Sequence, residues 1–234
     1  MNYDGILFDL DGTLLPMDND EFTKEYFKRL TKVGVKCGYD AETFQAAMWK
    51  GVGAMVKNDG SCCNEERFWS TVSGLLGPEI CGYGPVFDAF YDNEFHETKT
   101  FTRPNPLARK AVELAREKAG KVVLATNPLF PTNAVYARMS WIGLRPEDFD
   151  WITDYTNSST CKPNPAYYKE ITDKLDLDLQ RCIMIGNHVQ EDMEAAATAG
   201  MPGFWVTDWP INHGQEPECP KGSFEELIGY LQSL

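Results

Sequence analysis

The chain has 234 residues, and its 22 Lys or Arg against 35 Asp or Glu give a formal net charge of −13. This acidic balance argues against a nucleic-acid partner, because a phosphate backbone binds to basic surfaces. No apolar run approaches the ~20 residues of a membrane span and no signal-type segment is present, so we expect no membrane segment and no signal peptide. The seven cysteines form no CxxC pair and the three histidines show no zinc spacing, which favours a reduced, cytoplasmic protein.

An apolar run over residues 4–9 predicts a buried first strand. It leads into the segment "ILFDLDGTLLP", in which Asp9 and Asp11 stand one residue apart ahead of Gly12. The glycine permits a tight turn at this point. An Asp-Gly pair can be an ordinary turn that closes a strand, or the two carboxylates can carry chemistry.

Residues 16–98 show helical periodicity and no convincing strand. We predict Asp20, Asp40 and Asn64 as the N-caps of the first three helices and expect a fourth helix over 85–97. Because the stretch is too long for a loop, it predicts a helical subdomain inserted after the first strand. The aromatic residues of this segment recur at helical spacing and are interpreted as its own core. They include Phe22, Tyr26, Phe27, Phe44, Trp49, Phe68 and Trp69.

From residue 103 onward, apolar runs alternate with helical patterns. An amphipathic stretch over 106–119 precedes Gly120, the expected helix C-cap, and a strand at 121–126. This alternation predicts a five-stranded parallel sheet covered on both faces, a doubly wound, Rossmann-like α/β core. We assign residues 1–15 and 99–234 to this core and 16–98 to a helical cap. The other expected elements are strands at 149–154, 181–187 and 203–208, helices at 132–142, 165–175, 190–199 and 224–234, and a loop at 212–222.

Ligands of an open parallel sheet bind beyond the carboxyl ends of its strands. Polar residues at the predicted strand ends are therefore the candidates for function. The set offers a nucleophile, a hydroxyl donor, a cation and oxygen ligands for a metal. It consists of Asp9, Asp11, Thr126, Asn127, Lys162, Asn187 and Asp192.

Four short motifs occur in a fixed order: "DLDGT", "ATN", a lysine before "PNP", and "GNHVQED". They resemble the four motifs of the haloacid dehalogenase superfamily of phosphohydrolases. The helical insertion resembles the cap of the helical-cap branch, and the likeness covers the α/β core at both ends of the chain. The resemblance implies a Mg²⁺-dependent phosphatase that acts on a small phosphorylated metabolite.

The resemblance also assigns roles to individual residues. Asp9 is implied as the nucleophile that forms an aspartyl-phosphate, and Asp11 as the general acid and base. Thr126 and Asn127 are expected to bind phosphoryl oxygens. Lys162 is expected to balance the charge on the nucleophile and the phosphate.

A metal ion is expected between the nucleophile and the phosphate dianion, because the two repel each other. The resemblance implies Mg²⁺ held by Asp9, the backbone carbonyl of Asp11 and the fourth motif. That motif usually begins Gly-Asp, whereas this chain has Gly186-Asn187, with Asp192 in the place of the second acid. An amide oxygen can ligate a cation but carries no charge, so we predict a weaker metal site than usual.

Alternative functions remain open at this point. A phosphomutase of the same superfamily would use the same motifs, and Asn187 keeps open a degenerate member that binds a phospholigand or a protein partner without turnover. Haloacid dehalogenation is disfavoured, because those relatives lack the second aspartate and Asp11 is present. Phosphonate hydrolysis is disfavoured because it uses another residue at that position.

Overall fold

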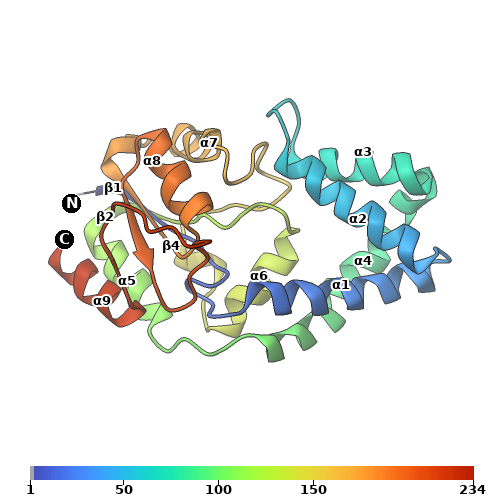
Figure 1. Ribbon diagram of the computed structural model, residues 1–234, viewed down its shortest axis with the longest axis horizontal. Coiled ribbons are helices and arrows are strands. Elements are labelled where there is room, and N and C mark those ends of the chain that lie inside the picture. Colours follow the sequence, from blue (N-terminus) through green and yellow to red (C-terminus); the bar gives the residue numbers. More distant parts are fainter. Residues whose placement is uncertain (1–2) are drawn as a thin grey trace.

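A parallel sheet of six strands forms the centre of one half of the molecule (Figure 1). The computed structural model describes residues 3–234. The strand order is β3-β2-β1-β4-β5-β6, and all neighbours pair in parallel. The predicted α/β class is therefore confirmed. The strands are β1 (Tyr3–Phe8), β2 (Ala119–Leu124), β3 (Trp151–Ile152), β4 (Cys182–Gly186), β5 (Gly203–Val206) and β6 (Lys221–Gly222).

β1 lies in the interior of the sheet, between β2 and β4. Ile6, Leu7 and Phe8 expose none of their surface. A strand with a neighbour on each edge and a covered face on each side has no polar side to show. This explains why the first strand is an uninterrupted apolar run rather than an alternating pattern.

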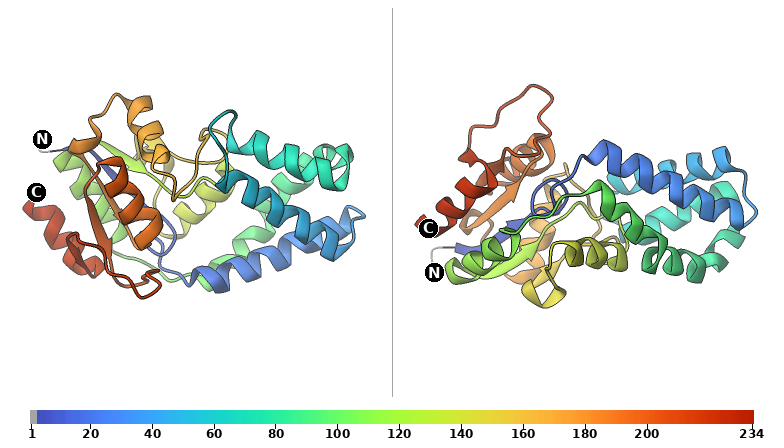
Figure 2. Two further views of the ribbon diagram at one scale, coloured as in Figure 1. Left: turned by 45° about the horizontal axis from the view of Figure 1, so that its top comes forward. Right: turned by 90° about the horizontal axis from the view of Figure 1, so that it is seen from below.

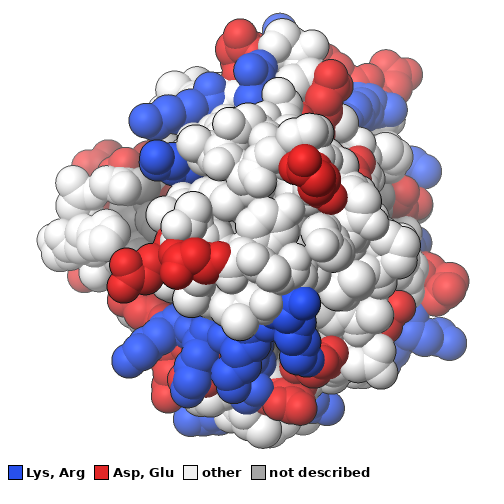
Figure 3. Space-filling model, turned by 90° about the vertical axis from the view of Figure 1, so that its right-hand side faces the viewer, with Lys and Arg blue, Asp and Glu red and all other residues white. Residues whose placement is uncertain are grey.

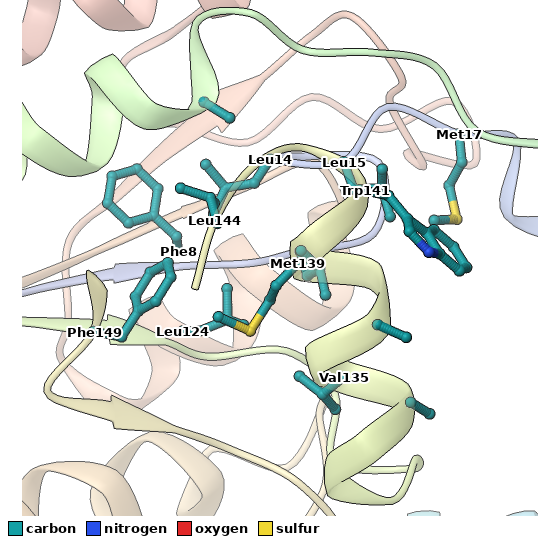
Figure 4. Packing of buried hydrophobic residues seen from close by; sticks show 14 of the residues in the cluster. Phe8, Leu14, Leu15, Met17, Leu124, Val135, Met139, Trp141, Leu144 and Phe149 are labelled. Carbon is teal, nitrogen blue, oxygen red and sulfur yellow. The ribbon is translucent and has the colours of Figure 1, made fainter. Parts of the chain in front are cut away.

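Helices cover both faces of the sheet. Phe8 belongs to the cluster that includes α5, α6 and α9, and Figure 4 shows Met139 of α6 beside Leu124 of β2 in that cluster. Leu7 points to the other face and packs with α7 and α8. The structure is thus doubly wound. These helices are α5 (Ala108–Lys118), α6 (Thr132–Trp141), α7 (Ala166–Leu175), α8 (Ala195–Ala199) and α9 (Phe224–Ser233), with short turns η3 (Pro146–Asp148), η4 (Leu179–Arg181) and η5 (Val189–Glu194).

A group of helices, here called the helical body, lies beside the sheet half along the long axis of the molecule (Figures 1 and 2). It packs on the sheet half through aromatic contacts. The ring of Phe95 lies 5.5 Å from that of Trp141 on α6, measured between centroids. The helical body consists of α1 (Asn19–Lys36), α2 (Ala41–Val56), α3 (Asn64–Leu76) and α4 (Gly84–Asp92), with η1 (Pro78–Tyr83) and η2 (Glu94–Phe101).

Asn64 links the helical body to the loops that follow β2 and β3. The residue exposes none of its surface. Its side-chain nitrogen donates to the carbonyl oxygens of Pro128 at 3.3 Å and Thr160 at 3.4 Å, and its backbone N–H donates to the carbonyl of Ser158 at 2.8 Å. A buried amide with these partners fixes the start of α3 against the sheet half, because separating them would leave polar groups unpaired.

Two of the three predicted helix caps are displaced. Asp18, not Asp20, caps α1, and its side chain accepts the Asp20 N–H at 3.0 Å. Asn64 was predicted as a cap, but Cys63 precedes α3 and Asn64 is its first helical residue. Asp40 caps α2 as predicted.

The sheet also differs from the prediction at Gly120 and in the number of its strands. Gly120 was expected to end a helix, but it lies inside β2, where a Cβ would stand 3.1 Å from the carbonyl oxygen of Asp4. The close approach of the neighbouring backbone explains the glycine. β6 falls in the predicted loop at 212–222 and gives the sheet a sixth strand. A strand of two residues, one of them a lysine, is too short to show the apolar pattern from which strands are predicted.

The surface of the helical body is unevenly charged. α1 carries Lys24, Lys28, Lys32 and Lys36 at four-residue spacing. Figure 3 shows Lys and Arg gathered in the lower half of this end of the molecule, the half in which α1 and η2 lie in Figure 1. A broad area beside them carries few charges. Across residues 3–234, no helix combines the length and apolar character that crossing a bilayer requires.

Candidate active site

Asp9 directly follows β1 and lies at the carboxyl edge of the sheet. Its backbone N–H donates to the carbonyl of Ile185 in β4 at 2.9 Å, which fixes its position. The residue exposes only 7% of its surface. Burial raises the pKa of Asp9 to about 6, the charge of Lys162 opposes this rise, and that of Asp192 adds to it. Asp9 is thus a fixed carboxyl that ionises close to neutral pH.

Lys162 comes from the loop between β3 and α7 and is buried. Its Nζ donates to Asp9 Oδ1 at 2.9 Å and to Asp192 Oδ1 at 2.6 Å. Burial by itself lowers the pKa of Lys162, but the carboxylates of Asp192 and Asp9 outweigh burial and hold the pKa well above its usual range. The ammonium group therefore stays charged and reduces the repulsion between the two acids.

The carboxylate of Asp11 is turned toward Arg138 of α6. Arg138 Nη1 donates to Asp11 Oδ2, and the guanidinium carbon lies 4.1 Å from the centroid of the Phe130 ring. Within residues 3–234, the buried atoms Asp11 Oδ1 and Arg138 Nη2 have no hydrogen-bond partner. Burial raises the pKa of Asp11, although the charge of Arg138 opposes the rise. A carboxyl of this kind is suited to hold and donate a proton.

Arg138 was missed by sequence reasoning. It exposes none of its surface and sits among Val135, Ala137 and Met139, which are also buried. α6 is thus apolar on the sides that flank the arginine. A buried arginine needs a buried partner for its charge. The signal in the sequence was therefore a single arginine between apolar residues of a helix.

Thr126 and Asn127 follow β2, which pairs with β1 in the sheet. The Thr126 carbonyl accepts from the Thr153 hydroxyl at 2.8 Å, which fixes the loop. Asn127 Nδ2 donates to Glu191 Oε2 at 2.9 Å and to the carbonyl of Lys162 at 3.3 Å. Asn127 Oδ1 is buried and unpaired among the residues described. The side-chain amide of Asn127 therefore connects the loop after β2 to the loop that contains Lys162.

Glu191 was not among the candidates, although it directly precedes Asp192. Both belong to the π-helical turn η5, which His188 caps by accepting the Glu191 N–H at Nδ1 over 3.3 Å. Burial raises the pKa of Glu191 to about 7 and lowers that of His188 to about 4. The site thus contains a further carboxyl that titrates near neutral pH and a neutral histidine.

Asn187 follows β4 and packs against the loop after β1. Thr13 Oγ1 donates to Asn187 Oδ1 at 3.1 Å. Gly12 has a φ of +85°, and a Cβ there would lie 2.2 Å from Asn187 Nδ2, so the position requires glycine. Asp192 Oδ2 accepts the N–H of His188 at 2.9 Å, in addition to the Lys162 bond at Oδ1.

The oxygen atoms at this site match Mg²⁺ in kind. They come from the carboxylates of Asp9 and Asp192, the amide of Asn187 and the backbone of Asp11, and Mg²⁺ prefers such ligands. Within residues 3–234, no three His, Cys, Asp or Glu side chains group as ligands of one ion. Residue 187 contributes an amide where a carboxylate would add one more acidic ligand. The residues therefore fit a hard cation in ligand type, with little negative charge to bind it.

The candidates chosen from the sequence lie in the segments that follow β1, β2, β3 and β4 at the carboxyl edge of the sheet, with Asp192 in η5 and the others in loops. Asp9, Lys162 and Asp192 are in direct contact. Among the others, Asn127 donates to the carbonyl of Lys162, and Asn187 is bonded to Thr13 in the loop after β1. Asp11 lies in that loop, bonded to Arg138, and Thr126 precedes Asn127 in the loop after β2.

The chain matches the model of the family described as haloacid dehalogenase-like hydrolases over residues 3–200. The match spans most of the sequence, so the protein belongs to this hydrolase family. A search among curated proteins finds no match.

Solved structures share the fold. The HAD-hydrolase YfnB from Bacillus subtilis, bound to magnesium, is 17% identical with a TM-score of 0.59, covering 99% of this chain and 100% of that one. A HAD phosphatase from Thermococcus onnurineus is 16% identical with a TM-score of 0.60, covering 97% of each chain. The L-2-haloacid dehalogenase from Xanthobacter autotrophicus is 12% identical with a TM-score of 0.57, covering 99% of each chain. At these identities the likeness shows the fold alone, and phosphatases and dehalogenases share it.

The Asp11–Arg138 pair should be strongly coupled in stability. We expect Asp11→Ala to lower the free energy of unfolding by about 3 kcal/mol, because it leaves a fully buried guanidinium without its counter-ion. Arg138→Met should cost less, since Asp11 is partly exposed and can take up a proton. The double variant should lose less than the sum of the two, as measured by urea unfolding. Additive losses would contradict the coupling.

Glu191→Gln should stabilise the protein at high pH. The pKa of Glu191 lies at about 7, above its ordinary value of 4.5, so its ionised form destabilises the folded state. This penalty develops as pH rises from 4.5 toward 7 and is complete above it. The melting temperature of the variant, with EDTA present, should therefore exceed that of the wild type at pH 8 and approach it at pH 4. The exposed Glu194→Gln is the control, and a difference independent of pH would refute the burial of charge.

Proposed function

We propose that the protein is a Mg²⁺-dependent phosphohydrolase that cleaves the phosphomonoester of a small metabolite through an aspartyl-phosphate. The observation that carries this proposal is the buried Lys162 ammonium, 2.9 Å from Asp9 Oδ1. It holds a carboxylate at the end of β1 beside Asp11, whose pKa burial raises. Membership of a hydrolase family supports the class of reaction.

In the first step, a carboxylate oxygen of Asp9 attacks phosphorus and forms the aspartyl-phosphate. The bond between phosphorus and the ester oxygen breaks, and its electron pair stays on the leaving alcohol. Asp11 gives its proton to that oxygen. Lys162 offsets the negative charge on Asp9 and the phosphoryl group, and the hydroxyl of Thr126 donates a hydrogen bond to a phosphoryl oxygen.

In the second step, water attacks the phosphorus of the aspartyl-phosphate. Asp11, now ionised, takes a proton from that water, and the bond between phosphorus and Asp9 breaks. Inorganic phosphate leaves, and both aspartates return to their starting states. Arg138 stabilises the ionised form of Asp11 between the two proton transfers, because its buried charge is already in contact with that carboxylate.

Mg²⁺ would be held by Asp9, the backbone carbonyl of Asp11 and the amide oxygen of Asn187, with Asp192 nearby. When bound, it would reduce the repulsion between the phosphate dianion and the Asp9 carboxylate. Asn187 Oδ1 accepts a hydrogen bond from Thr13 at 3.1 Å, so this hydroxyl competes with a metal for the oxygen. The chain's own residues thus support weak rather than tight metal binding.

Phosphoester cleavage is favoured over dehalogenation by Asp11. A halide leaves without a proton, so a dehalogenase has no use for an acid with a raised pKa at this position. An alkoxide needs that proton. The buried Asp11–Arg138 pair is therefore better accounted for by hydrolysis of a phosphate ester.

We further propose that residues 16–98 act as a cap over the site and that the protein works in the cytoplasm. The bond network of Asn64 supports a cap held against the catalytic loops. All seven cysteines are free, which suits a reducing compartment.

The decisive measurement is the hydrolysis of p-nitrophenyl phosphate with Mg²⁺ and with EDTA. We expect Mg²⁺-dependent turnover by the wild type and a loss of at least about 1,000-fold in kcat for Asp9→Asn, which removes the nucleophile. The variant Asp4→Asn, at the opposite end of β1, is the control. Turnover that survives in Asp9→Asn would refute the mechanism. If neither this ester nor a metabolite panel is hydrolysed, the protein is a binding member of the family.

Asn187→Asp should bind Mg²⁺ more tightly and be less stable without it. The wild-type amide donates to the carbonyl oxygen of Trp209, and a carboxylate would instead repel that oxygen. We therefore expect a lower melting temperature in EDTA, a larger rise on adding Mg²⁺, and a lower Mg²⁺ concentration for half-maximal activity. A variant that binds Mg²⁺ no more tightly at neutral pH would count against Asn187 as a ligand.

A further inference from the structure

A cavity of about 990 Å³ lies between the helical body and the loops that follow β2 and β3. All four helices of the helical body line it, together with residues 129–131 and Tyr155. Pockets of about 300–1,000 Å³ hold whole drug-sized ligands, so this volume is far more than a phosphoryl group or a two-carbon alcohol requires.

Some aromatic residues predicted as core of the helical body line this cavity instead. Phe44 is buried as predicted. Phe68 and Trp69 line the cavity and are only partly buried, and Trp49 lines it while exposing 46% of its surface. Large apolar side chains that keep free surface inside a concave site are available to a ligand.

The cavity is connected to Asp11 through Phe130 and Arg138. The segment 129–131 that lines it is separated from Thr126 and Asn127 only by Pro128. The centroid of the Phe130 ring lies 5.2 Å from that of Tyr26. The guanidinium carbon of Arg138 lies 4.1 Å from the Phe130 centroid. Arg138 in turn binds Asp11. Asp11 does not itself line the cavity, but a leaving alcohol that extends from Asp11 into it passes this aromatic wall.

The lining is apolar and, where charged, mainly acidic. Its charged residues are Asp20, Glu65 and Asp88 against Lys24. Such a wall repels an anionic leaving group such as a carboxylate or a second phosphate. A bulky aromatic group without negative charge gains from burial against Trp69 and Phe130 and meets no repulsion.

We propose that the leaving group of the substrate is a bulky aromatic alcohol that carries no negative charge, and that it is bound in this cavity. The proposal rests on the proposed phosphatase function and names the substrate class for it. Small anionic esters such as phosphoglycolate are poor substrates, because they leave the cavity empty and face its acidic residues. Trp69 and Asp88 determine this specificity: Trp69 offers apolar contact to the aromatic group, and Asp88 repels an anionic one.

The test compares two alkyl phosphates, 2-phenylethyl phosphate and phosphoglycolate. With Mg²⁺ present, kcat/KM should favour the aromatic ester by about ten- to hundredfold, the range expected from burial of one aromatic ring. Binding of both esters to Asp9→Asn by calorimetry provides a readout without turnover and should show the same preference. Equal or reversed preference in binding overturns the proposal. Aromatic preference in binding without turnover by the wild type supports the ligand class while the phosphatase function fails.

Variants locate the preference in the cavity. Trp69→Ala should reduce the preference for the aromatic ester at least about fivefold, and Asp88→Lys should improve binding of phosphoglycolate by removing the repulsion. Tyr136→Ala is the matched control, because Tyr136 exposes 40% of its surface on α6 and does not line the cavity. If Trp69→Ala fails to fold, Asp88→Lys alone decides, since Asp88 is exposed. An unchanged preference in the cavity variants, or a changed one in Tyr136→Ala, would falsify the assignment.

Discussion

The side-chain nitrogen of Lys162 lies buried between Asp9 and Asp192, which follow the first and fourth strands in chain order. Two carboxylates this close to one another, shielded from water, would repel and protonate without a cation between them. The ammonium group also ties together the loops after β1, β3 and β4. The site thus depends on one buried charge that lets a carboxylate remain ionised at the end of a rigid strand.

A second buried pair sets the state of the other aspartate. Asp11 is bonded to Arg138, which reaches it from α6 and is stacked on Phe130. Burial and ion pairing act on the Asp11 pKa in opposite directions, and burial is the larger effect. The two neighbouring aspartates therefore have different cations, a lysine for Asp9 and an arginine for Asp11, which suits the different roles proposed for them, nucleophile and proton carrier.

The helical body contributes most of the lining of the cavity that we propose for the organic part of the substrate. Asn64 fixes the start of α3 against the loops after β2 and β3, so α3 carries Trp69 to a defined place near the site. Phe130 belongs to both parts, because it lines the cavity and supports Arg138. In the proposed function, one aromatic ring thus links the chemistry at phosphorus to the choice of leaving group.

The sequence by itself determined five of the six strands of the sheet, the alternation of strands and helices, and the loops that carry Asp9 and Lys162. These follow from local patterns: apolar runs, helical periodicity and the rule that parallel strands present their carboxyl ends at one edge. Tertiary structure alone decided the partners. Arg138 pairs with Asp11 across 127 positions of sequence, and Asn64 turns from a predicted cap into a buried link. Such contacts depend on how distant elements pack, and no local pattern of residues encodes which side chains then share a low-dielectric space.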